Sequence, residues 1–250
     1  MQDPDSGSYL VLSLNVSPSL RRLDQPLLKL LSQTHSVSQW EYHQTEDEPC
    51  SLTVALVLLH DYLKSCPRPV HLIGHGTGGL LGLLYARQHP KRVKSLALLS
   101  VGIHPAVDWQ AHYYVQRQML SCSREAILAQ MAQHLFKSPA ALPIPMFRRI
   151  QMLERDIENS LSPHSLFRRH CLPSGNISSP LMVCGGAEDI VVDPNQLWGW
   201  QKLLKPEDRI WSCPESGYFF HFSHPELLAA QLSEFWSSCA VPAQALLQSS

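Results

Sequence analysis

Four glycines stand within six positions directly after a short apolar run, and this pattern limits the folds open to the chain. The run Val70–Ile73 predicts a buried strand, because it is short, contains β-branched residues and follows a proline. After the glycines a helix-forming stretch continues to about Gln88, and Pro90 prevents its extension. A strand, a glycine-rich turn and a helix in this order are typical of a sheet covered by helices.

Apolar runs and helix-forming stretches alternate along most of the remaining chain, which predicts a mainly parallel sheet flanked by helices. The expected strands are residues 9–14, 37–42, 70–73, 93–100, 181–184 and 209–213, and further helices are expected at residues 26–31, 51–64, 195–204 and 225–236. Between residues 105 and 173 the strand signals stop, and prolines interrupt the helix formers. We therefore expect a core of residues 8–104 and 174–238, a helical insertion at 105–173 and a loose tail at 239–250.

The composition is that of a folded domain. Of the 250 residues, 44% are hydrophobic, and the formal net charge of -1 provides no bulk attraction to nucleic acid. No apolar run approaches the roughly 18 residues of a membrane span, and no positively charged segment typical of a signal peptide opens the chain. The seven cysteines are scattered without a CxxC pair. We therefore expect a cytoplasmic protein with no metal, no cofactor, no nucleic-acid partner and no membrane span.

Three segments together resemble the α/β-hydrolase fold. Residues 70–80 resemble its strand–elbow–helix, in which a G-x-S-x-G turn lifts a nucleophilic serine above the sheet. Residues 184–194 resemble the loop that carries the catalytic acid, and residues 216–226 resemble the segment that carries the catalytic histidine. The resemblance spans roughly residues 8–237 and begins at the family's third strand. It implies that the insertion at 105–173 is the family's helical cap.

The resemblance also assigns the three positions of a catalytic triad, and two of them carry unsuitable residues. Gly76 stands at the serine position, where it has no side chain to form an acyl intermediate. Tyr218, directly after Gly217, stands at the histidine position, and a phenol with a pKa of about 10 is a poor general base at neutral pH. Asp189 retains the residue type of the acid. Without a histidine to orient, Asp189 is expected to cap a turn or to accept backbone N–H groups.

The neighbouring loops differ from the family pattern as well. One oxyanion donor, the backbone N–H of Thr77, would need no particular side chain. The second usually comes from a His-Gly turn after the third strand, and here that stretch reads Leu14-Asn15-Val16-Ser17-Pro18. Glycine at position 76 would also relax the strained backbone of the elbow. If the pocket binds a ligand, we expect its lining to include Asn15, Val16, His75, Gly76, Thr77 and Tyr218.

Two hypotheses of function follow. The first is a catalytically inactive member of the superfamily that binds a small apolar ligand or a protein partner through the cap. The second is a hydrolase, esterase or lyase without the serine, in which Thr77 is a substitute nucleophile and His221 a displaced base. Both residues also have plainer roles, because Thr77 suits the first turn of a helix and His221 lies beyond the expected position. The pairs His71/His75 and His221/His224 lack a third ligand, so we expect no metal site.

The expected cap carries two Phe-Arg-Arg segments, at residues 147–149 and 167–169. Basic side chains of this kind are typical of a solvated face, and they also suit an acidic partner. The cap contains four of the six methionines, Met119, Met131, Met146 and Met152. Methionine fills irregular gaps in cores and adapts to partners at surfaces, so both roles are open at this point.

Overall fold

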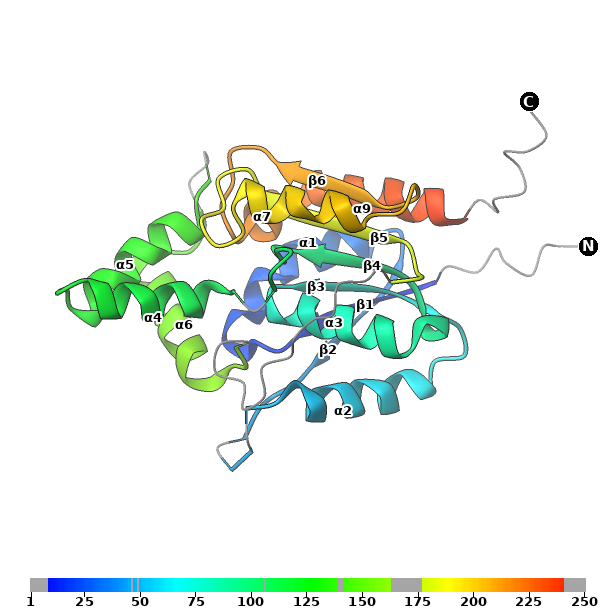
Figure 1. Ribbon diagram of the computed structural model, residues 1–250, viewed down its shortest axis with the longest axis horizontal. Helices are drawn as coiled ribbons and strands as arrows, with labels where there is room; N and C mark the ends of the chain where they lie inside the picture. Colours follow the sequence, from blue (N-terminus) through cyan, green and yellow to red (C-terminus); the bar gives the residue numbers. More distant parts are fainter. Residues whose placement is uncertain are drawn as a thin grey trace, which may run out of the picture.

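The computed structural model describes residues 9–240 except positions 46, 49, 106, 139–141 and 163–176. Within these residues the centre is a sheet of six parallel strands in the order β2-β1-β3-β4-β5-β6 (Figure 1). The strands are β1 (Leu10–Asn15), β2 (Ser36–Glu41), β3 (Val70–His75), β4 (Val93–Leu99), β5 (Leu181–Gly186) and β6 (Arg209–Cys213). Each lies within two residues of an expected strand, and the predicted class of a parallel sheet flanked by helices is confirmed.

Burial on both faces explains why the inner strands are continuous apolar runs. Along β1, Leu12 and Leu14 join one hydrophobic cluster, whereas Val11 joins the other. Two pairs of helices cover the two faces, α2 (Leu52–Lys64) with α3 (Thr77–Gln88) on one and α1 (Gln25–Leu31) with α9 (Pro225–Ala240) on the other (Figure 1). A short 3-10 helix, η2 (Pro90–Arg92), connects α3 to β4. No described helix combines the length and apolar character needed to cross a membrane.

Three helices between β4 and β5 stand beyond the carboxyl ends of the strands, and we call them the cap helices (Figure 1). They are α4 (Trp109–Met119), α5 (Arg124–Leu135) and α6 (Met146–Asn159). The last of them packs on η1, the 3-10 helix Pro18–Leu23 that follows β1. Of the expected insertion, residues 163–173 lie outside the described residues, and these include the second Phe-Arg-Arg segment.

The carboxyl-terminal part differs in detail from the predicted elements. In place of the single helix expected at 195–204, the structure has α7 (Pro194–Trp198) followed by the 3-10 helix η4 (Gly199–Leu203). Within η4, Trp200 Nε1 donates to the carbonyl of Val101 (2.9 Å), just after β4. A short helix, α8 (Phe220–Ser223), precedes α9. Helix α9 continues to Ala240, two residues into the segment expected as a tail, and residues 241–250 lie outside the described residues.

Candidate functional site

The turn between β3 and α3 is the sharp strand-to-helix turn that the sequence predicts. Gly76 adopts φ 51° and ψ -121°, in the left-handed region that favours glycine. Its N–H donates to the carbonyl of Leu99 (2.9 Å). At the start of α3, a Cβ on Gly78 would lie 2.3 Å from the backbone oxygen of Leu14. Glycines therefore allow strand and helix to meet backbone to backbone, and the positive φ agrees with the interpretation that glycine relaxes strain at position 76.

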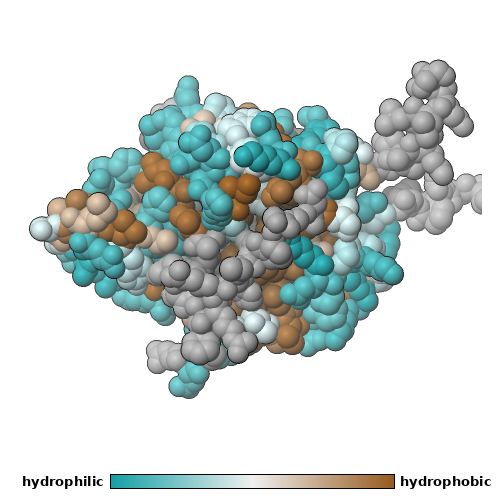
Figure 2. All heavy atoms as spheres, viewed as in Figure 1, coloured by the Kyte–Doolittle hydropathy of each residue, from teal (hydrophilic) through white to brown (hydrophobic). Residues whose placement is uncertain are grey.

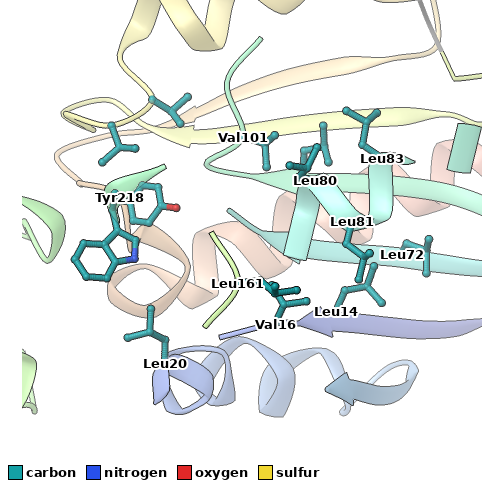
Figure 3. Close-up of a cluster of buried hydrophobic side chains, with 14 of the residues drawn as sticks. Leu14, Val16, Leu20, Leu72, Leu80, Leu81, Leu83, Val101, Leu161 and Tyr218 are labelled. Atoms are coloured by element: carbon teal, nitrogen blue, oxygen red, sulfur yellow. The ribbon is translucent and has the colours of Figure 1, made fainter. Parts of the chain in front are cut away.

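The side chain of Tyr218 fills the space beside Gly76. A Cβ on Gly76 would lie 2.5 Å from Tyr218 Oη and 3.6 Å from its Cζ. The tyrosine is 2% exposed, and Figure 3 shows it among buried side chains that include Val16, Leu20 and Leu161. Burial, strengthened by the negative charge of nearby aspartates, raises the pKa of Tyr218 well above its usual value. A neutral phenol therefore stands where the side chain of a nucleophile would begin.

Asp189, in the loop after β5, accepts hydrogen bonds from backbone N–H groups of its own loop and from a serine hydroxyl. Its Oδ1 accepts from the N–H groups of Val191 (2.8 Å) and Val192 (3.0 Å), and its Oδ2 accepts from Ser100 Oγ (3.0 Å). The same hydroxyl lies 2.9 Å from the carbonyl oxygen of Tyr218, so Ser100 links the two loops. Burial raises the pKa of Asp189 to about 7. The carboxylate thus caps a turn, the plainer of the roles considered for it.

Two imidazole rings lie at the same end of the sheet. His75 Nε2 donates to the carbonyl of Tyr218 (3.0 Å), and the His75 and His221 ring centroids are 4.3 Å apart. Burial, with a contribution from His221, lowers the pKa of His75 well below its usual value. His221 Nε2 lies 3.4 Å from Asp24 Oδ1. Its Nδ1 is buried and, within the described part of the chain, has no hydrogen-bond partner.

A cavity of about 30 Å³ lies between these side chains and the cap helices. Its lining includes His221 and the six residues expected to contact a ligand, Asn15, Val16, His75, Gly76, Thr77 and Tyr218. A space of this size holds roughly one or two water molecules. Small-molecule pockets are larger, at about 300–1,000 Å³. The structure therefore brings the expected residues together around a space that is too small for an apolar ligand.

Of the residues at the expected oxyanion positions, Asn15 has another structural role. Asn15 Nδ2 donates to Asp24 Oδ2 (2.7 Å), and its Oδ1 accepts from the N–H of Ser17 (2.9 Å). The Asn15 side chain therefore holds the turn after β1. Thr77 is buried at the first position of α3.

Three carboxylates that line the cavity, Asp24, Asp108 and Asp156, are absent from the sequence-based prediction. Asp108 caps α4 by accepting from the N–H of Ala111 (2.9 Å), and Asp156 accepts from Trp109 Nε1 (3.0 Å). Burial raises the pKa of both Asp108 and Asp156 to about 6. An aspartate before a helix-forming run is an N-cap signal, so Asp108 was open to prediction. Among the described residues, no group of three or more His, Cys, Asp or Glu side chains is arranged to hold a metal ion.

Comparisons with known proteins agree with this architecture. Residues 65–134 match a family model described as alpha/beta hydrolase fold. The chain is 50% identical over 228 residues to the uncharacterized protein sll0249 of Synechocystis sp., covering 91% of this chain and 90% of that protein. It is 43% identical over 226 residues to the uncharacterized protein alr2406 of Nostoc sp., covering 90% of each.

A solved structure shows the same likeness at the level of the fold. Naproxen esterase (carboxylesterase NP) from Bacillus subtilis matches with a TM-score of 0.67 at 16% identity, covering 92% of this chain and 84% of that one. At an identity this low, the likeness shows a shared fold and does not indicate a shared activity. With the family match, the parallel sheet and the strand-to-helix turn at Gly76, these findings show that the chain belongs to the α/β-hydrolase fold superfamily.

Proposed function

We propose that this chain is a catalytically inactive α/β-hydrolase-fold protein that acts as a protein-interaction scaffold. The observation that carries the proposal is the contact between Gly76 and Tyr218, whose hydroxyl takes the space in which a nucleophilic side chain would begin. In subtilisin, loss of the nucleophile or of the base lowers kcat by about 10⁶. Here glycine supplies no nucleophile, and a neutral phenol is a poor base.

The cavity supports a protein partner over a small apolar ligand. It measures about 30 Å³, and the side chain of Tyr218 forms one of its walls. A small ligand would therefore require the tyrosine to move out of a buried position. A protein partner needs no cavity, because an exposed apolar patch is sufficient for docking.

An apolar patch of this kind lies on α4 and directly after it. Val115 is 52% exposed, Met119 77% and Leu120 41%. Figure 2 shows hydrophobic side chains at the protruding end of the cap. Side chains of this type are costly to leave in water, and methionine adapts its shape to the surface that covers it. We therefore assign this patch, named here the cap patch and defined by these three residues, as the docking surface.

One observation favours a second candidate, a hydrolase that lacks the serine. His221 lies beside Asp24 and lines the same cavity as Thr77. A histidine oriented by a carboxylate and placed near a hydroxyl is the arrangement that activates a nucleophile. The activating contact itself is missing, because His221 Nδ1 has no hydrogen-bond partner within the described residues and Nε2 faces Asp24. This candidate therefore ranks second.

A covalent probe distinguishes the two candidates. The protein is treated with a fluorophosphonate and analysed by intact-mass spectrometry, and a panel of acyl esters is assayed in parallel. The scaffold proposal predicts neither an adduct nor turnover. An adduct on Thr77, lost in Thr77→Val and weakened in His221→Gln, would overturn the inactivity and establish the second candidate.

The docking surface is tested by substitution of the cap patch. Proteins cross-linked to the wild-type chain in cell extract are compared with those cross-linked to Val115→Glu/Met119→Glu. Leu227→Glu is the control, because Leu227 is 46% exposed on α9, outside the cap. We expect one partner to be retained by wild type and control and lost by the double variant. Equal capture by all three proteins would contradict the assignment of the cap patch.

A further inference from the structure

A second concave region lies where α6 packs on η1, and it shares no described lining residue with the cavity at the elbow. It encloses about 890 Å³, which is within the range of small-molecule sites. Four arginines line it, Arg21 and Arg22 from η1 and Arg148 and Arg155 from α6. Among the described residues that line it, none is an aspartate or a glutamate. We call this region the arginine groove.

Much of the positive charge in the arginine groove is not neutralised by the protein. Arg21 has an acidic neighbour, Glu41, at 3.5 Å, and the arginine side chain is 58% exposed. Arg148 donates to the amide oxygen of Gln151 (3.1 Å), which carries no charge. Arg22 and Arg155 are exposed and form no ion pair with any residue that the structure describes. Exposed ion pairs are weak, so even Arg21 keeps most of its attraction for an anion.

Helix α6 separates its charges between two faces. Glu154 and Glu158 point to α5, where both pair with Arg124 at 3.4 and 2.9 Å. Arg148 and Arg155 lie seven positions apart, so they stand about two turns and roughly 10 Å apart on the groove side. The acidic residues that would usually neutralise such arginines are thus committed to the other face of the helix.

The beginning of α6 adds to the positive potential of the groove. Pro145 occupies the N-cap without a side-chain hydrogen bond, and the first turn contains no acidic residue. The amino-terminal end of a helix carries a partial positive charge. Pro145 and Arg148 both line the groove, so this end of the helix opens into it. The remaining wall includes Pro18, Ile144 and Met152, which offer apolar contact.

We propose that the arginine groove binds a small ligand that carries phosphate groups. The planar guanidinium donates two parallel hydrogen bonds to phosphate oxygens. Arginines on two facing walls can pair with more negative charge than a single carboxylate carries, which favours a ligand with several phosphate oxygens. The apolar wall accommodates an uncharged part of the ligand. This binding site goes beyond the proposed scaffold function and does not depend on the state of the elbow, because the described linings of the two sites have no residue in common.

The test is titration calorimetry of the full chain with inorganic pyrophosphate at low ionic strength. Wild type is expected to bind, and Arg22→Gln/Arg155→Gln to bind at least tenfold more weakly. The control is Arg117→Gln/Lys202→Gln, which removes two exposed positive charges outside the groove and is expected to bind as wild type does. Circular dichroism establishes that each variant is folded.

Three outcomes would overturn the proposal. They are no binding of pyrophosphate by wild type, equal loss in the groove and control variants, and binding of citrate as tight as that of pyrophosphate. The last would mean that the groove recognises negative charge and not phosphate. A nucleoside diphosphate that binds more tightly than pyrophosphate would support the role of the apolar wall. Ester turnover by wild type would refute the scaffold function and leave this binding result unaffected, so the two failures are distinguishable.

Discussion

The hydroxyl of Tyr218 and the missing side chain of Gly76 are complementary. A Cβ at position 76 would come within 2.5 Å of that hydroxyl, although the rest of the tyrosine ring stays at 3.6 Å or more from it. Glycine thus makes room for the tyrosine, and the tyrosine fills the space that glycine leaves. The two positions therefore constrain each other: a tyrosine at 218 disfavours any side chain at 76, and a side chain at 76 would displace the tyrosine hydroxyl.

This relationship predicts a strong coupling between the two positions. Gly76→Ala should lower the free energy of unfolding by about 2–4 kcal/mol, because it adds backbone strain at positive φ and an overlap with Tyr218 Oη. Tyr218→Phe removes the overlap, so the double variant should recover about 1–3 kcal/mol of that loss. Urea unfolding of the two single variants and the double variant gives the coupling energy directly. Strictly additive effects would show that the hydroxyl does not limit position 76.

Restoring the family residues should not restore an efficient enzyme. In Gly76→Ser/Tyr218→His we expect weak ester hydrolysis at best. Asn15 remains bound to Asp24, and Asp189 remains bound to Ser100 and to two backbone N–H groups. Hydrolysis of p-nitrophenyl acetate, compared with wild type after correction for the folded fraction, is the measurement. Rapid turnover would mean that the oxyanion donors and the acid are already in place.

Close packing at the elbow predicts contrasting effects of alanine at two glycines of α3. A Cβ on Gly78 would lie 2.3 Å from the backbone oxygen of Leu14, which cannot move without displacing β1. A Cβ on Gly82 would meet only the tips of two leucine side chains, at 3.0 and 3.2 Å. Gly78→Ala should therefore cost about 3 kcal/mol or more. Gly82→Ala should be nearly neutral, since alanine gains about 1 kcal/mol in helix propensity.

Thermal unfolding of these two variants is a matched comparison, because both replace a glycine of the same helix by the same residue. A Tm loss of similar size in both would contradict the picture of a backbone contact confined to the beginning of α3. A Gly78→Ala chain that does not fold would agree with it, provided that Gly82→Ala folds normally.

The buried carboxyl of Asp189 predicts a dependence of stability on pH. Its pKa is raised from 3.8 to about 7 in the folded protein, so between these values the folded state binds more protons than the unfolded chain. The contribution of Asp189 to the free energy of unfolding is therefore fully present below about pH 4 and is lost as pH rises through about 7. Asp189→Asn does not titrate, so it should gain stability relative to wild type across this window.

The measurement is urea unfolding of wild type and Asp189→Asn at several pH values from 4 to 8. The difference between the two proteins should change by at most about 1.4 kcal/mol per pH unit. His71 and His75, whose lowered pKa values act with the opposite sign, are present in both proteins and cancel in the difference. A difference that stays constant with pH would show that Asp189 is ionised throughout.

The sheet and the turn at Gly76 could be predicted from the sequence because both are local. Strands buried on two faces are continuous apolar runs, and a backbone-to-backbone contact between β3 and α3 requires glycine at fixed positions. The order along the chain of residues 70–80, 184–194 and 216–226 then reduces the number of folds that fit the sequence to one family. These features need no knowledge of how distant side chains pack.

Other parts of the site depend on contacts between segments that are distant in the chain, and no local sequence pattern predicts these contacts. Asp24 meets His221 across the fold, and Asp156 is buried although its helix is highly charged. The first Phe-Arg-Arg segment is another example, because only one of its arginines is free to face a ligand. Arg148 lines the groove, whereas Arg149 donates to the carbonyl of Ile144 (2.8 Å) and lies over the ring of Phe136.

The left-handed turn at Gly76 shows that the backbone shape of this family's elbow does not require a nucleophilic side chain. The backbone there has φ 51° although position 76 offers no side chain, and the backbone of Gly78 packs closely against that of Leu14 at the start of the following helix. A comparison of backbones alone will therefore group this chain with working esterases. Sorting proteins of this fold by activity therefore requires the side chains that stand around the turn.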